Sequence, residues 1–89
     1  MRVDDFLFDA VNLDKLGARG ITDRQVRQVL DNEHRIVRNR KRRSGTYLVI
    51  GRDNGGACLA IPIQPTHSPG LWRPLTAWFC KAREWATLE

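Results

Sequence analysis

Two apolar segments joined by Asp-Asn-Gly-Gly constrain the fold of this chain more than any other feature. The first is TYLVIGRD, residues 46–53, and the second is ACLAIPIQ, residues 57–64. Both are nearly continuous in strand-forming apolar residues, which is typical of β-strands that are covered on one or both faces. The glycines between them supply the positive φ angles that a tight turn requires. The sequence therefore predicts a β-hairpin over this region.

Helices are predicted before the hairpin. Asp9 is a candidate N-cap for a helix over residues 10–20, with Leu13 and Leu16 forming an apolar stripe that Val11 or Ala10 extends. A second helix, from Thr22 to about Asp31, is better marked. Thr22 and Gln25 have capping-box spacing, Ile21 and Val26 have hydrophobic-staple spacing, and the expected inward residues are Val26, Val29 and Leu30.

Strands and one more helix complete the expected order. Further strands are predicted at VDDFLF (residues 3–8), HRIVRN (34–39) and LWRPLTA (71–77), and WFCKAREWATLE (78–89) is a terminal helix with Trp78, Ala82 and Trp85 at helical spacing. Pro62 lacks an N–H, so its strand is expected to stop pairing on one side there or to lie at an edge. We predict one α+β domain over residues 1–89, an antiparallel sheet in the order β-α-α-β-β-β-β-α.

Positive charge is concentrated in one short stretch. The chain carries fifteen Lys and Arg against ten Asp and Glu, and six of the cations lie within residues 35–43, which hold no acid. Such a focused cluster neutralises phosphates better than a diffusely basic surface does. We interpret it as a surface that binds a polyanion; a solvated loop or a nuclear-import signal is the alternative. The cluster comprises Arg35, Arg38, Arg40, Lys41, Arg42 and Arg43.

Metal and nucleophile chemistry have little support in the sequence. His34 and His67 lie far apart without accompanying carboxylates, and no Gly-x-Ser-x-Gly or phosphate-binding glycine loop is present. We expect no metal and no cofactor. Cys58 and Cys80 form no Cys-x-x-Cys pair, and we expect both to be reduced and buried. Acidic residues interrupt the N-terminal segment and no apolar stretch approaches about 20 residues, so a cytoplasmic, membrane-free protein is expected.

Arginines on strands and turns remain as candidate functional residues. Paired guanidinium N–H groups bind phosphate oxygens and stabilise the charge that accumulates as RNA is cleaved by its own 2′-hydroxyl, without a metal. Tyr47 or a histidine is a further candidate for proton transfer, although Tyr47 also fits a core position, and Trp72 is a candidate for base stacking. We assign transition-state contacts to Arg73, Arg52 and Arg38, and RNA binding to Arg40, Lys41, Arg42 and Arg43, and we expect them to converge on one concave surface.

The order of short motifs resembles that of a known family. KLGARGITDRQVRQVL, YLVIG, ACLAIPIQPT and WRPLTA, followed by a helix with Glu84, are together similar to the BrnT-like toxins of the RelE/ParE superfamily. The resemblance covers most of the chain from Phe6 onward. It implies a RelE-like fold and a bacterial ribonuclease toxin of a type II toxin–antitoxin pair, which a cognate antitoxin neutralises. A homodimer and a toxin–antitoxin hetero-oligomer both fit this prediction.

The chain also departs from that family at two places. Ala18-Arg19-Gly20 replaces a common Lys-His-Gly, and Thr76-Ala77-Trp78 replaces a common Ser-Ala-Arg, so Arg73 matches a family position while a second arginine is absent. Two interpretations stay open beside a metal-independent endoribonuclease that cleaves mRNA or ribosome-associated RNA. The domain can bind nucleic acid without cleaving it, or its basic turn can bind an acidic partner such as an antitoxin tail.

Overall fold

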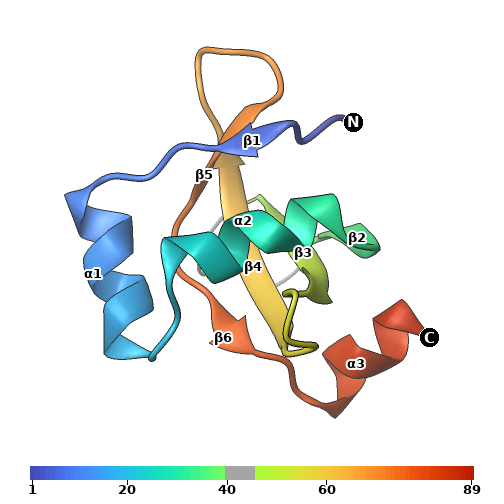
Figure 1. The fold of residues 1–89 in the computed structure, drawn as a ribbon. Coiled ribbons are helices and arrows are strands. Elements are labelled where there is room, and N and C mark those ends of the chain that lie inside the picture. The colour runs from blue at the N-terminus through green and yellow to red at the C-terminus, as the bar shows by residue number, and fades with distance from the viewer. Residues whose placement is uncertain (40–45) are drawn as a thin grey trace.

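One mixed sheet and three helices make up the part of the chain that the computed structural model describes, residues 1–39 and 46–89 (Figure 1). The strands lie in the order β1-β5-β4-β3-β2, with β6 pairing with β4 off this path. The elements are β1 (Asp5–Phe6), α1 (Ala10–Ala18), α2 (Asp23–Asp31), β2 (His34–Arg38), β3 (Tyr47–Arg52), β4 (Cys58–Pro65), β5 (Leu71–Pro74), β6 (Trp78–Phe79) and α3 (Ala82–Leu88). The α+β prediction is confirmed, with β6 as an additional strand and β1–β5 as a parallel pair.

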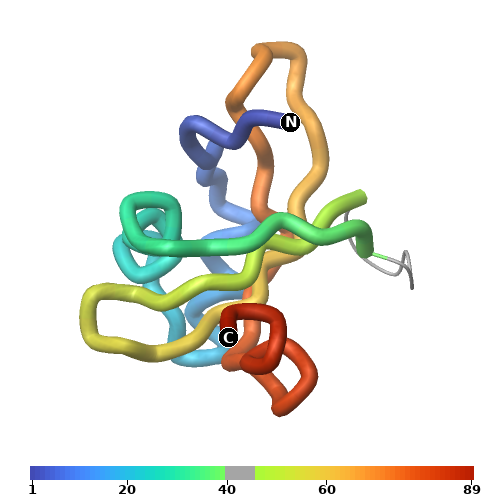
Figure 2. Tube along the Cα trace, turned by 90° about the vertical axis from the view of Figure 1, so that its right-hand side faces the viewer, coloured from blue at the N-terminus to red at the C-terminus, as the bar shows by residue number. Residues whose placement is uncertain are grey.

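Helices cover the sheet from two sides. Figures 1 and 2 show α2 across one face of the strands and α3 against the other, and Figure 1 shows α1 on the side of β5. Because side chains alternate along a strand, Val49 of β3 packs with Val26 and Val29 on the α2 face, whereas Ile50 packs with Leu88 on the α3 face. The hairpin between β3 and β4 is thus covered on both faces, which explains its nearly continuous apolar sequence.

The second predicted helix is confirmed in detail. Thr22 caps α2, its hydroxyl accepts from the Gln25 N–H at 3.1 Å, and the Gln25 side chain accepts from the Thr22 N–H at 2.9 Å. Gln25 also donates to Asp53 at 2.9 Å, which joins the start of α2 to the β3–β4 turn. Gly51 lies directly beneath α2, where a side chain would collide with Val29. The glycine therefore lets helix and strand approach closely.

The first helix begins at its predicted cap but buries a different set of residues. Leu16 is buried as expected, whereas Val11 and Leu13 are 56% and 41% exposed. Asn12 is fully buried instead, because its side chain accepts from the Asp9 N–H at 2.9 Å and donates to the Leu7 carbonyl at 3.0 Å. The predicted stripe is thus confirmed at Leu16 and wrong at Leu13 and Val11.

Pro62 lies in a central strand, at a break in pairing on one side. It is opposite Leu48 of β3, while on its other side β6 pairs with β4 at Leu59 and Ala60, and β5 pairs from Ile63 onward. The prediction that pairing stops on one side is confirmed. The missing N–H falls where no neighbouring strand needs a donor.

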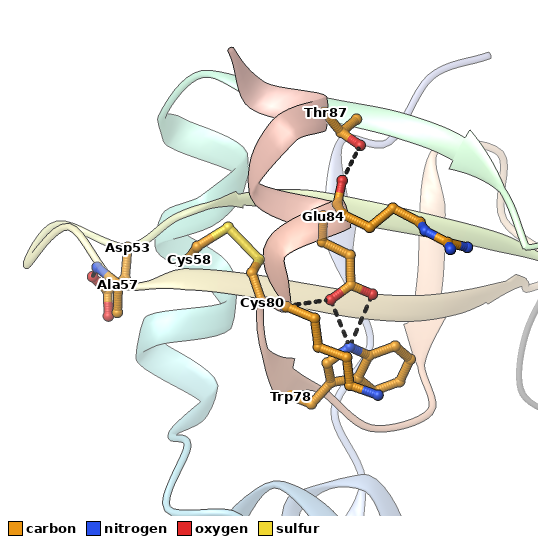
Figure 3. Close-up of a disulfide and its surroundings, with 9 residues drawn as sticks. Asp53, Ala57, Cys58, Trp78, Cys80, Glu84 and Thr87 are labelled. Atoms are coloured by element: carbon orange, nitrogen blue, oxygen red, sulfur yellow. Dashed lines mark hydrogen bonds between the residues drawn. A yellow bond between two sulfur atoms is a disulfide. The ribbon is translucent and has the colours of Figure 1, made fainter.

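The C-terminal segment corrects two predictions. The helix expected from Trp78 begins only at Ala82, because Trp78 and Phe79 pair with β4 as β6. This pairing also brings Cys80 beside Cys58, and the two form a disulfide (Figure 3). The prediction of two reduced thiols is therefore wrong. None of the helices within the two described ranges is long and apolar enough to span a membrane.

Candidate nucleic-acid interface

Two of the three arginines predicted to contact the transition state, Arg38 and Arg52, lie at opposite ends of the β2–β3 hairpin. Arg38 ends β2 opposite Tyr47, and Arg52 ends β3 opposite Cys58. Five residue steps along β3 separate these two ends, which corresponds to about 17 Å. The four cations assigned to RNA binding lie outside the described residues: Arg40, Lys41, Arg42 and Arg43.

The pleat of the sheet also places these arginines on different faces. Arg38 is paired with Tyr47, whose ring packs against the core on the α2 face. Arg52 and Arg73, whose partners on β4 are Cys58 and Gln64, belong by alternation to the α3 face. Six steps along β4 separate those partners, about 20 Å. The expected convergence of Arg38, Arg52 and Arg73 on one surface is therefore wrong.

Arg73 is held in an internal ion pair. Its Nε lies 2.7 Å from Asp9 Oδ2 and its Nη2 lies 3.3 Å from Asp9 Oδ1, a bidentate arrangement, and the Arg73 side chain is only 25% exposed. The hydrogen bond from Arg73, together with that from the Asn12 N–H, lowers the pKa of Asp9 below its usual value. Arg73 thus joins β5 to the start of α1, and its charge is already compensated.

Arg52 contacts an aromatic ring, whereas Arg73 contacts a carboxylate. Its guanidinium carbon lies 5.0 Å from the ring centroid of Trp85 on α3, within the range of a cation–π contact. It forms no ion pair with a carboxylate of the described residues, and the residue is exposed. A stacked guanidinium is oriented by the ring while its N–H groups stay available for a ligand.

Arg35 lies on the same face as Arg52. It is paired with Ile50, two positions before Arg52 on the neighbouring strand, so the two cations are diagonal neighbours. Glu33 lies 4.0 Å from Arg35, and both side chains are more than half exposed, so this contact is weak. We call Arg35, Arg52 and Trp85 the α3-face cluster.

A second group of polar and aromatic residues lies on the α2 face. Arg38 is exposed and faces Tyr47, whose ring meets Trp72 edge-on with centroids 5.7 Å apart. Trp72 is half-buried and donates its indole N–H to the Arg2 carbonyl at 2.9 Å. The phenol and the indole are therefore in contact, and Arg38 is the cross-strand neighbour of Tyr47.

Trp78 occupies the position where the family resemblance leads one to expect an arginine. Its indole N–H donates to both carboxylate oxygens of Glu84 at 3.1 Å, and Arg19 lies 6.0 Å from its ring centroid (Figure 3). The carboxylate of Glu84 also accepts from the Lys81 N–H at 2.9 Å. These contacts fix the start of α3 and leave the Glu84 side chain internally bonded.

Sequence reasoning missed three functional features of the site. Trp85 was predicted only to share a helix face with Trp78 and Ala82, Asp9 only to cap a helix, and Cys58 to be a free thiol. Spacing along the chain contains no signal for these contacts, because each one joins segments far apart in sequence. Among the described residues, no three His, Cys, Asp or Glu side chains form a group that could hold a metal ion.

Comparisons with known protein-family models, with curated proteins and with solved structures gave no match.

Proposed function

We propose that this domain binds single-stranded nucleic acid through its phosphates, with the α3-face cluster as one contact surface. The observation that carries the proposal is the exposed Arg52 guanidinium, supported by Trp85 and without an acidic partner among the described residues. Arg35 beside it adds a second cation on the same face. Paired cations and an aromatic ring are the groups with which proteins bind backbone and base of a single strand.

The distribution of charge supports the same function. Without residues 40–43 the chain has eleven cations and ten acids, so nearly all of the net charge of +5 belongs to that short run. In sequence, the run begins two residues after Arg38, and Arg38 lies at the far end of the hairpin from Arg52.

Fluorescence anisotropy with labelled 12-nucleotide RNA and DNA at several salt concentrations tests this proposal. We expect affinity to fall linearly with the logarithm of salt concentration, and Arg52→Ala to reduce the slope by about 1. Arg24→Ala is the matched control, because it removes an exposed cation from α2, on the opposite side of the sheet. Absence of salt-dependent binding, or equal effects of the two substitutions, would argue against the proposed interface.

We propose endoribonuclease activity of the toxin type as a second candidate. The observation that favours it is the group of Arg38, Tyr47 and Trp72, which combines a phosphate-binding cation, a hydroxyl that can transfer a proton, and a stacking ring. A cognate antitoxin would be the partner of such a toxin, and the cytoplasm its compartment.

Tyr47→Phe separates the two candidates because it removes only the hydroxyl. Purified protein is incubated with RNA in EDTA, with and without ribosomes, and products are resolved on a gel. Cleavage by the wild type that Tyr47→Phe abolishes, with binding retained, would support the enzyme. Binding without product from either protein selects the binding module.

A further inference from the structure

A covalent bond joins the central strand to the segment that carries Trp85. Cys58 is the first residue of β4, and Cys80 lies two residues before α3 begins (Figure 3). Cys58 is 3% exposed, whereas Cys80 is half-buried and hence the more accessible of the two.

Besides the disulfide, only noncovalent contacts between described residues hold α3 against the sheet. The Cys80 N–H donates to the Cys58 carbonyl at 2.9 Å, and Trp85 and Leu88 pack on the α3 face. Glu84 also accepts hydrogen bonds from the Trp78 indole of β6 and from the Lys81 N–H. A helix of seven residues is not stable in isolation, so α3 depends on its attachment. The disulfide supplies the covalent part of that attachment.

We propose that Cys58–Cys80 is a thiol–disulfide exchange site that controls the nucleic-acid affinity of the α3-face cluster. This inference rests on the proposed nucleic-acid binding. In the oxidised protein α3 holds Trp85 beneath Arg52. In the reduced protein α3 separates from the sheet more often, Arg52 loses the ring that orients it, and affinity falls.

The proposed reductant is a dithiol, which reduces the disulfide in two exchange steps. Its thiolate attacks Sγ of Cys80, the bond between the two sulfurs breaks, and Cys58 leaves as a thiolate that takes up a proton. The second thiol of the reductant then attacks the mixed disulfide and releases Cys80, which is also protonated. Two electrons pass to the protein and the reductant becomes a disulfide.

The experiment compares oxidised protein with protein reduced by dithiothreitol. Hydrogen exchange of residues 82–88, followed by mass spectrometry, reports on α3, and anisotropy with the 12-nucleotide RNA reports on the cluster. We expect faster exchange in 82–88 and a three- to tenfold loss of affinity on reduction, on the order of a lost cation–π contact and its orientation. Reoxidation should restore both values.

Two variants make the test specific. C58A/C80A should show the same hydrogen exchange in residues 82–88 and the same RNA affinity as the reduced wild type, and dithiothreitol should change neither value. In Arg52→Ala, reduction should still loosen α3 but should no longer lower affinity. Unchanged exchange and affinity on reduction would overturn the inference, as would an equal loss of affinity in Arg52→Ala. If the oxidised wild type binds no RNA, the proposed function fails, and the exchange measurement still decides whether the disulfide holds α3.

Discussion

Replacing Gly51 by alanine should destabilise the protein through collisions with two identified neighbours. A Cβ at this position would lie 2.7 Å from Val29 Cγ1 and 2.8 Å from His34 Cβ. Favourable carbon–carbon contacts lie at about 3.5–4.0 Å, so both contacts are too short by roughly 1 Å. Val29 is fully buried and β-branched in a helix, so its side chain has no alternative rotamer to adopt. The helix itself must shift.

The expected cost is about 1–2 kcal/mol. Overpacking of a core costs about 1–3 kcal/mol, and the smaller entropy of the unfolded alanine chain offsets about 0.4–1 kcal/mol of it. In a domain of this size that corresponds to a decrease in Tm of about 5–15 °C. Urea unfolding followed by tryptophan fluorescence, under oxidising conditions throughout, measures the free energy of unfolding.

Gly17→Ala is the matched control for this prediction. It makes the same chemical change inside α1, where a Cβ would meet nothing within 4 Å, and should stabilise the protein by up to about 1 kcal/mol. Val29→Ala should relieve the contact with Val29 Cγ1 while that with His34 Cβ remains, so the double variant G51A/V29A should be more stable than the sum of the single effects predicts. Strictly additive effects, or an unchanged Tm for G51A, would refute the steric explanation.

Three further outcomes follow from the same structure. Asp9→Ala should lower Tm more than Arg73→Ala, in thermal unfolding followed by circular dichroism, because Asp9 both caps α1 and binds Arg73. The hydrogen bond from Gln25 lowers the pKa of Asp53 in the folded protein. As the pH falls through the usual aspartate pKa of about 4, the unfolded chain therefore binds more protons than the folded one, and the free energy of unfolding decreases. Asp53→Asn should make this decrease smaller in urea unfolding measured from pH 7 to pH 3. Removing the disulfide in C58A/C80A should cost about 3 kcal/mol, because the loop that it closes spans 22 residues, and an unchanged urea midpoint would contradict that value.

Local chemistry determined most of the secondary structure. The N-caps at Asp9 and Thr22, the turn glycines and the two apolar strand segments each act over a few residues, so they can be seen without the fold. This explains why α2, the start of α1 and the β3–β4 hairpin match their predicted positions. The last helix was predicted too long, because Trp78 and Trp85 have helical spacing although only Trp85 lies in the helix.

The tertiary structure decided which functional groups meet. Pairing of β6 with β4 placed Cys80 beside Cys58, and the alternation of side chains separated Arg38 from Arg52. The sequence shows that an arginine is charged but not whether an acid, an aromatic ring or solvent surrounds it. Its environment is determined by the packing of segments that are distant in sequence. Sequence alone therefore identified the cations, while the fold determined that Arg73 is neutralised by Asp9 and that Arg52 rests on Trp85.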